Sequence, residues 1–276
     1  MQIRGPQSGQ GRGTVFDRAA ASYGRIGGQF FEQAGQALVQ LALPQPGEDL
    51  LDVGCGRGAS LLPAAAAVTP RGRAIGIDKS SAMVSQANRA LAARGLTHAF
   101  AVVADADALP TRAGTFDVLL AGLVLQFLPE PQRTLRRLTH MLRPGGRIAI
   151  CTPAAAPDDL DIVDRTADAA LIEFMGASAQ ERAHMPGIDS SAIVAAIHQL
   201  EYVKIQVLNM FFPISVPVSK FWDWRMSHGR RTQLERIPEE DRERAREKLV
   251  ESVRAVSVAG QVHLPMPVCM IAAYRT

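Results

Sequence analysis

Apolar, β-type runs alternate with helix-like stretches through the first half of this chain. Such alternation predicts βαβ units, in which parallel strands form one sheet that carries helices on both faces. The second half is mostly helical, with strand-like runs at residues 201–211 and 261–275. We therefore expect a doubly wound α/β fold with a mostly parallel, seven-stranded sheet and a helical lid inserted in the C-terminal half. The five early runs are residues 49–54, 73–78, 99–104, 115–121 and 146–151, and the helix-like stretches between them are residues 59–67, 81–94 and 131–142.

A glycine-rich loop directly follows the first of these runs. In the stretch LLDVGCGRGAS (50–60), the run ends in Asp52, and Gly54, Gly56 and Gly58 follow at alternate positions. Glycine lets the backbone turn sharply and approach a ligand closely. A loop of this kind typically closes around a nucleotide, but its spacing alone also fits the dinucleotide fingerprint of nicotinamide enzymes.

The carboxylates near this loop help to separate the two cofactor classes. A nicotinamide dinucleotide places an anionic pyrophosphate at the helix N-terminus, where Asp52 would repel it. S-adenosylmethionine has no phosphate and carries an ammonium and a sulfonium group, so an aspartate at this position favours it. Asp78 ends the second run, where a carboxylate can accept hydrogen bonds from the ribose hydroxyls of either class. Asp105 follows the third run and is placed to accept from an adenine amino group.

Further segments lie in register with these motifs: ADADALP (104–110), FDVLLAGLVLQFLPEP (116–131) and MLRPGGRIAI (141–150). Together the set resembles the class I S-adenosylmethionine-dependent methyltransferases, and most of all the quinone C-methyltransferase-like and natural-product branch. The resemblance covers residues 14–152 and, loosely, the remainder, and it implies a Rossmann-like sheet that binds S-adenosylmethionine. It also implies that Tyr23 closes over the cofactor. The residues that match the family's cofactor-binding positions are Asp52, Gly54, Gly56, Gly58, Asp78, Lys79, Met83, Asp105, Ala106, Gly122 and Leu123.

One position departs from that family, because many relatives have two histidines where this chain has Gln126 and Phe127. Glutamine orients a substrate but does not take a proton at neutral pH, which leaves open whether the site holds a base. Trp224 and His228 lie four residues apart in a helix-like stretch, a spacing that places them on one helical face. We expect this face to line the acceptor pocket, with His228 orienting the acceptor or receiving its proton. The alternative is that Trp224 is a structural anchor and His228 merely lies near the helix end at Gly229. The candidate catalytic residues are Tyr23, Gln126 and His228, and the candidate acceptor-binding residues are His184 and Trp224.

Aromatic residues cluster in the second half of a chain that is only 5% aromatic. Packing of the lid against the sheet and contact with a flat or greasy acceptor explain this cluster equally well. If some of these rings face the pocket, the acceptor is a small hydrophobic molecule. The clustered residues are Phe211, Phe212, Phe221, Trp222 and Trp224.

Charge and cysteine content exclude several classes of partner. The formal net charge of +3 is too small to indicate nucleic acid, and the interspersed signs over residues 225–254 predict a solvated helix face. The three cysteines lie far apart and are odd in number, so they predict no disulfide framework, no metal site and a reducing cytoplasm. No apolar run is long enough to span a membrane, and the N-terminus lacks a secretory signal.

We therefore expect a disordered tail at residues 1–13 and a single domain over residues 14–276. Its cofactor-binding core takes residues 14–152, and residues 153–276 supply the substrate lid and the last two strands. The predicted reaction transfers methyl from S-adenosylmethionine to carbon or oxygen of a small hydrophobic metabolite, such as a natural product or quinone-like acceptor, by positioning for in-line displacement. The alternatives are an S-adenosylmethionine-binding cyclase, with or without methylation as the trigger, and a noncatalytic sensor. The oligomeric state, including a homo-oligomer, stays open.

Overall fold

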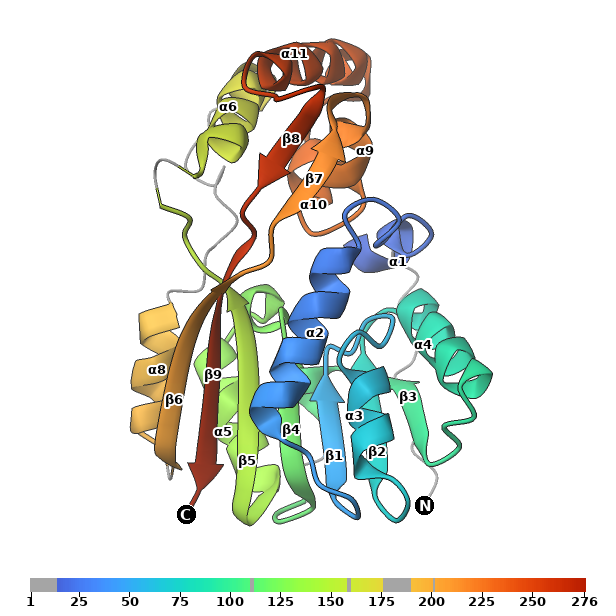
Figure 1. Cartoon of the computed structure of the whole chain (residues 1–276), viewed down its shortest axis with the longest axis vertical. Coiled ribbons are helices and arrows are strands. Elements are labelled where there is room, and N and C mark those ends of the chain that lie inside the picture. Colours follow the sequence, from blue (N-terminus) through green and yellow to red (C-terminus); the bar gives the residue numbers. More distant parts are fainter. Residues whose placement is uncertain (1–13, 110–111, 158–159, 176–189, 201) are drawn as a thin grey trace.

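The main sheet is mostly parallel and contains the strands that the first half of the sequence predicts (Figure 1). The computed structural model describes residues 14–109, 112–157, 160–175, 190–200 and 202–276, so the predicted tail at residues 1–13 lies outside the described residues. The strands are β1 (Asp49–Val53), β2 (Arg73–Asp78), β3 (Ala99–Val103), β4 (Phe116–Gly122), β5 (Leu142–Pro153), β6 (Tyr202–Phe211) and β9 (Pro267–Arg275). Within the described residues these seven strands lie in the order β3-β2-β1-β4-β5-β9-β6. Among these seven strands β9 alone runs in the opposite direction, since it pairs antiparallel with both β5 and β6. The sheet is therefore mostly parallel, and the predicted fold class is confirmed.

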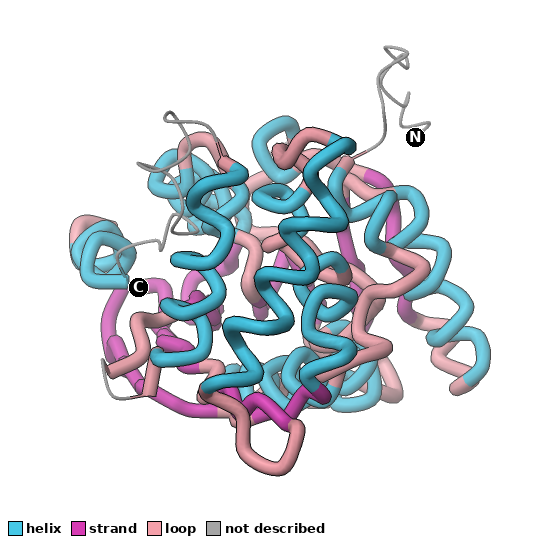
Figure 2. The backbone as a smooth tube through the Cα atoms, turned by 90° about the horizontal axis from the view of Figure 1, so that it is seen from above, coloured by secondary structure: helices cyan, strands magenta, loops and turns pink. Residues whose placement is uncertain are grey.

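Helices cover both faces of this sheet. One apolar cluster joins α2 (Gln29–Ala42), α3 (Leu61–Val68) and α4 (Ser81–Ala93) to one face. A second cluster joins α5 (Pro131–Met141) and α8 (Ser190–His198) to the other face. Figure 2, viewed from above, shows helical segments around the strands. This layering follows from parallel pairing, because each crossover between parallel strands places a helix on a face of the sheet.

Residue spacing explains which sides these elements bury. In α2 the buried residues Phe30, Ala34 and Leu38 recur every four positions and form one apolar stripe. In β4 and β5 most residues are buried without alternation. Continuous burial of this kind is typical of central strands that are covered on both faces.

A lid stands above the carboxyl ends of the parallel strands (Figure 1). It contains α6 (Ile162–Leu171), α9 (Phe221–Met226), α10 (Arg231–Leu234), α11 (Arg242–Ala255) and the antiparallel pair β7 (Ile214–Pro217) and β8 (Gln261–Leu264). The chain runs from β6 into β7 and from β8 into β9, and the Phe212 N–H donates to the Met266 carbonyl between these two connections at 3.3 Å. The lid is therefore attached to the sheet by two neighbouring segments. Among the described residues, no helix has both the length and the apolar character needed to cross a membrane.

The structure corrects two expectations in this half of the chain. The strand predicted at residues 261–275 is split into β8 and β9, because Pro265 has no N–H to donate and Met266 adopts a left-handed φ of 44°. The predicted solvated face at residues 225–254 describes much of α11 but is wrong for Arg225, whose side chain is fully buried. The sequence does not predict β7, because a strand of four residues is too short to show an alternation of apolar and polar side chains.

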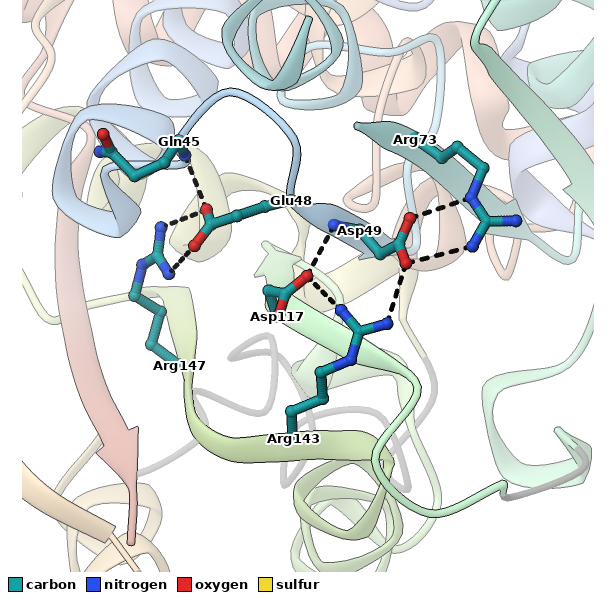
Figure 3. A network of polar contacts seen from close by, with 7 residues as sticks. All are labelled: Gln45, Glu48, Asp49, Arg73, Asp117, Arg143 and Arg147. Carbon is teal, nitrogen blue, oxygen red and sulfur yellow. Dashed lines mark hydrogen bonds and ion pairs between the residues drawn. The ribbon is translucent and has the colours of Figure 1, made fainter. Parts of the chain in front are cut away.

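A network of ion pairs ties the amino-terminal ends of the strands together (Figure 3). Arg143 on β5 bridges Asp49, at the start of β1, and Asp117 on β4. Asp117 also accepts a hydrogen bond from the Asp49 backbone N–H at 2.8 Å, and Arg73 on β2 pairs with Asp49 at 2.9 Å. This edge of the sheet lies opposite the lid (Figure 1).

Arg147 belongs to the same edge, and its side chain is only 9% exposed. Its guanidinium donates to both carboxylate oxygens of Glu48, at 2.8 and 2.7 Å. It also donates to the backbone oxygens of Ala42 and Leu43. These two carbonyls end α2, where helical carbonyls have no partner within the helix. Arg147 therefore fixes the end of α2 to the sheet.

The variant Arg147→Met should lower the free energy of unfolding by about 3 kcal/mol, because it removes a buried ion pair with Glu48 and leaves the Ala42 carbonyl without its donor. Gln45 still donates to Glu48 and to the Leu43 carbonyl. The affinity for cofactor should stay unchanged, since the substituted side chain lies at the opposite edge of the sheet. Urea unfolding and calorimetry measure the two quantities. The control is Arg73→Met, which removes an ion pair of a 66% exposed arginine and should cost less than about 1 kcal/mol. Equal losses in the two variants would contradict the role given to Arg147.

Candidate active site

A cavity of about 1880 Å³ opens between the carboxyl ends of the strands, α1 (Val15–Ala19) and the lid. Most of the residues predicted for the site lie on its wall. Asp52 and Asp105 are not among the lining residues, and His184 lies outside the described residues. The predicted residues that line the cavity are Tyr23, Gly54, Gly56, Gly58, Asp78, Lys79, Met83, Ala106, Gly122, Leu123, Gln126, Trp224 and His228.

Asp78 lies at the carboxyl end of β2, beside the glycine loop that follows β1. Its carboxylate accepts hydrogen bonds from the Gly56 N–H at 2.9 Å and the Ser80 N–H at 2.8 Å. Burial raises the pKa of Asp78, and these two hydrogen bonds oppose that shift. The loop itself is tied to β2, because the Cys55 N–H donates to the Ile77 carbonyl at 2.9 Å. Parallel pairing of β1 and β2 therefore holds a carboxylate in a fixed position at the cavity wall.

The glycines of this loop serve two different purposes. A Cβ at Gly54 would lie 2.3 Å from a methyl carbon of Val124, so glycine allows the segment after β4 to pack against the loop. At Gly56 an added Cβ would meet nothing within 4 Å, but the φ of 51° disfavours any residue with a side chain. Gly56 therefore presents bare backbone to the cavity, whereas Gly54 is required by packing within the protein.

Asp52 lies beneath the loop and is fully buried. Its carboxylate accepts a hydrogen bond from the Ser60 hydroxyl at 2.7 Å, and its Oδ1 has no partner in the described part of the chain. Burial raises the pKa of Asp52 to about 7, and repulsion from Asp78 acts in the same direction. Asp52 thus influences the cavity through its charge, from behind Ser60, and does not form part of the wall.

Asp105 is turned toward neighbouring protein groups. Its carboxylate pairs with the Lys79 ammonium at 3.0 Å and accepts a hydrogen bond from the Asp107 N–H at 2.9 Å. The following residue, Ala106, is buried and lines the cavity in its place. Contact between Asp105 and an adenine amino group therefore stays a prediction that this ion pair opposes.

Aromatic rings form one wall of the cofactor end. Tyr23 packs on Phe31, with ring centroids 4.6 Å apart, and Phe16 contacts Phe127 at 5.0 Å. Burial raises the pKa of Tyr23, so its phenol is a neutral hydroxyl. Sequence reasoning missed Phe16 and Phe31, because a single ring outside a motif gives no signal that it faces a cavity.

Gln126 lies on the short 3-10 turn that follows β4. Its side-chain N–H donates to the Leu123 carbonyl at 2.8 Å, which fixes the orientation of the amide. Its Oε1 is buried and has no hydrogen-bond partner among the residues that the structure describes. A buried oxygen in this state is costly unless a ligand supplies a donor.

Trp224 and His228 are in contact, as their spacing predicts. Their ring centroids are 4.5 Å apart, although α9 ends at Met226. The His228 Nδ1 lies 2.7 Å from the Trp224 carbonyl. Because a carbonyl only accepts, Nδ1 carries the proton and Nε2 is an acceptor. Burial, together with nearby Arg230, lowers the pKa of His228 to about 3, so the ring is neutral at physiological pH.

The lid also brings charged groups to the cavity that the sequence did not single out. Arg230 donates to Asp164 at 2.8 Å and to Asp168 at 3.5 Å. Arg225, fully buried behind them, also donates to Asp168. Three aspartates of this group, including Asp161, lie three to four positions apart at the start and along α6, a spacing that places them on one face. Their distance in sequence from the arginines explains why no motif marks them.

The residues present fit S-adenosylmethionine. The Asp78 charge raises the pKa of Asp52, and both carboxylates would repel a pyrophosphate, whereas a cationic ligand relieves the repulsion between them. The bare backbone at Gly56 leaves room for a ligand beside the Asp78 carboxylate. The unpartnered Oε1 of Gln126 can accept from an ammonium group.

Comparison with known proteins agrees with this assignment. A family model described as a methyltransferase domain matches residues 51–150. The chain is 31% identical to nocamycin O-methyltransferase of Saccharothrix syringae over 93% of this chain and 96% of that relative. The chain belongs to the S-adenosylmethionine-dependent methyltransferases. This methyltransferase is also 38% identical to an aklanonic acid methyltransferase from a Streptomyces species, over 50% of this chain and 63% of that relative. The YcgJ protein of Bacillus subtilis shares its fold, with a TM-score of 0.60 and 16% identity over 88% of this chain and 98% of the other.

The variant Asp78→Ala should weaken the binding of S-adenosylhomocysteine at least tenfold. It removes a carboxylate that can accept charge-assisted hydrogen bonds, each worth about 1.5–3 kcal/mol. Isothermal calorimetry measures the affinity, and circular dichroism shows whether the variant is folded. Asp107→Ala is the control, because Asp107 is not among the lining residues. Unchanged affinity in a folded Asp78→Ala variant would remove Asp78 from the site.

Affinity for S-adenosylmethionine should rise as the pH increases from about 5 to about 7, and then level off. Below the Asp52 pKa of about 7 the carboxyl group is protonated, and a cationic ligand favours its ionised form. In the ligand-free protein the same raised pKa should lower the free energy of unfolding as the pH rises through this range. Asp52→Asn should flatten both profiles in calorimetry and thermal unfolding. A wild-type affinity that does not change with pH would contradict this assignment.

Proposed function

We propose that this methyltransferase transfers a methyl group from S-adenosylmethionine to a hydroxyl oxygen of a hydrophobic natural product. The observation that carries the proposal is the cavity, which extends from the cofactor end to the underside of the lid. Its volume of about 1880 Å³ exceeds the range of roughly 300–1,000 Å³ that is usual for a pocket holding one ligand. A space of this size accommodates the cofactor together with an acceptor of considerable size.

Apolar side chains favour a hydrophobic acceptor. They line the cavity between the sheet and the lid, where a flat or greasy molecule would lose its contact with water. The names of the two relatives, which refer to nocamycin and aklanonic acid, support a natural product as the acceptor. The apolar lining residues include Phe30, Leu128, Leu160, Ile172, Leu264 and Met266.

His228 favours oxygen as the methylated atom. Its Nε2 is an acceptor on the cavity wall, suited to the O–H of a hydroxyl group. With a pKa of about 3 the ring holds a proton poorly at neutral pH, so His228 orients the acceptor and is not a strong base. When bound, S-adenosylmethionine supplies an electrophilic methyl group. The residues of the chain would hold the acceptor in line, and such positioning lowers the barrier without a strong base. As the methyl group reaches the oxygen, S-adenosylhomocysteine would be released and the O–H would become strongly acidic, so that the weakly basic Nε2 of His228 would suffice to take the proton and pass it to solvent.

Tyr23 and Gln126 contribute positioning at the cofactor end. The Tyr23 ring lies against Phe31, and its backbone carbonyl accepts a hydrogen bond from Arg57 of the glycine loop. Gln126 is held by its bond to the Leu123 carbonyl. We expect Tyr23 to close over the cofactor and Gln126 to orient a ligand donor, and neither residue to move a proton.

The experiment that tests this function uses the full chain with S-adenosylmethionine carrying a labelled methyl group. It is incubated with a panel of hydroxylated aromatic and polyketide-like acceptors, and the products are separated by mass. Transfer of label to oxygen supports the proposal, and transfer to carbon contradicts the choice of atom. Ring closure without label transfer would indicate a cyclase, which the names of the relatives do not favour. Cofactor binding without any product would indicate a sensor.

The variant His228→Phe should lower kcat/KM at least tenfold for the acceptor found in that panel. Phenylalanine keeps a ring against Trp224 but removes the acceptor nitrogen. The affinity for S-adenosylhomocysteine should stay within a factor of about two, because the lost group lies at the lid end. The control is His263→Phe, which changes a histidine of β8 whose bond to Ser215 is exposed. Normal turnover in a folded His228→Phe variant would exclude this role.

A further inference from the structure

Two residues on the cavity wall hold a buried oxygen without a hydrogen-bond partner among the described residues. They are Gln126, through Oε1, and Asp164, through Oδ1. The other oxygen of Asp164 accepts from Arg230 at 2.8 Å. Arg225 approaches the unpartnered oxygen only to 3.6 Å, which is too far for a hydrogen bond. Both unpartnered atoms are acceptors, so each can be satisfied only by a donor.

Two further groups at the lid end are acceptors of the same kind. The tautomer of His228 leaves Nε2 with a lone pair, and no hydrogen bond to it is found within the described part of the chain. Asp161 begins α6 and lines the cavity, and its carboxylate makes no hydrogen bond or ion pair with the described residues. Burial and the neighbouring Asp164 raise its pKa, and the charges of Arg230 and Arg165 oppose this shift without forming an ion pair with Asp161.

Two arginines line this end of the cavity, Arg165 and Arg230, and both already interact with other groups. Arg230 is 18% exposed and is shared between Asp164 and Asp168. Arg225 has unpartnered nitrogens, but it is fully buried behind the wall and is not among the lining residues. An entering carboxylate would therefore compete with two aspartates for Arg230 and would face a third at Asp161.

We propose that the lid end of the cavity, formed by Asp161, Asp164, His228 and Arg230, selects acceptors that present hydroxyl or other hydrogen-bond donors and rejects carboxylates. This inference rests on the proposed function and adds which functional groups the acceptor presents to the lid end of the cavity. A pocket whose unsatisfied groups are acceptors discriminates strongly against a ligand that lacks the donor, because those groups stay unpaired in the complex.

Three flat probes of one ring system test the inference: 2,6-dihydroxyanthraquinone, 2,6-dimethoxyanthraquinone and anthraquinone-2,6-dicarboxylate. Each is titrated by calorimetry into the full chain saturated with S-adenosylhomocysteine. The dihydroxy compound should bind at least tenfold more tightly than either of the others, since it alone offers donors at neutral pH. Equal affinities, tighter binding of the dicarboxylate, or no binding of the dihydroxy compound would overturn the inference.

One variant tests whether the lid end of the cavity causes this preference. Asp161→Asn keeps the shape of the side chain but adds a donor, and no described contact of Asp161 is lost. The affinity for the dihydroxy probe should fall at least fivefold, and the ratio of its affinity to that of the dicarboxylate should decrease. Asp223→Asn is the matched control, because this lid aspartate pairs with Lys220 and does not line the cavity. Equal effects of the two variants would overturn the assignment.

These measurements are independent of turnover, so failure of the inference is distinguishable from failure of the proposed function. A preference for the dihydroxy probe without any label transfer would uphold the selectivity and contradict the reaction. Label transfer to an acceptor together with equal affinities for the three probes would support the reaction and contradict the selectivity.

Discussion

The position of the Asp78 carboxylate is the constraint on which the cofactor end depends. Two backbone N–H groups hold it, one from the glycine loop and one from Ser80 at the start of α4. The Ser80 hydroxyl in turn donates to Asp17 of α1 at 2.5 Å. Arg18, the next residue, pairs with Glu235 beside α10 at 2.5 Å. Through these contacts and the covalent link from Asp17 to Arg18, the Asp78 carboxylate is connected to the lid. Helix α1 therefore contacts both the cofactor end and the lid end of the cavity.

The sheet and the lid supply different parts of the cavity wall. The strands and their loops supply the carboxylates and bare backbone suited to a cationic nucleoside, and the lid supplies the lining residues that we propose face the acceptor. The lid reaches the sheet through the connections at Phe212 and Met266, which lie side by side. An apolar cluster continues from α2 into the lid through buried residues such as Trp224 and Leu264. The acceptor region is thus part of a packed structure and not a loose appendage.

Local patterns in the sequence were sufficient to predict the sheet, its flanking helices and the glycine loop, because each of these rests on residue spacing within a short segment. The contact between Trp224 and His228 was predictable for the same reason. The orientation of Asp52 and Asp105 was not, since it depends on Ser60 and Lys79, which compete with any ligand for the two carboxylates. The pairing of Arg225 with Asp168 joins residues 57 positions apart and leaves no local trace.

The two tryptophans of this chain, Trp222 and Trp224, both belong to α9. The sheet and the glycine loop contain no tryptophan, so the tryptophan emission of the protein arises in the lid alone. Trp224 is buried and stacks on Phe221, whereas Trp222 is only partly covered. The emission therefore combines one shielded and one partly hydrated indole within a single helix. Changes in this emission would therefore report on the lid, the part of the molecule proposed to contact the acceptor, without any added label.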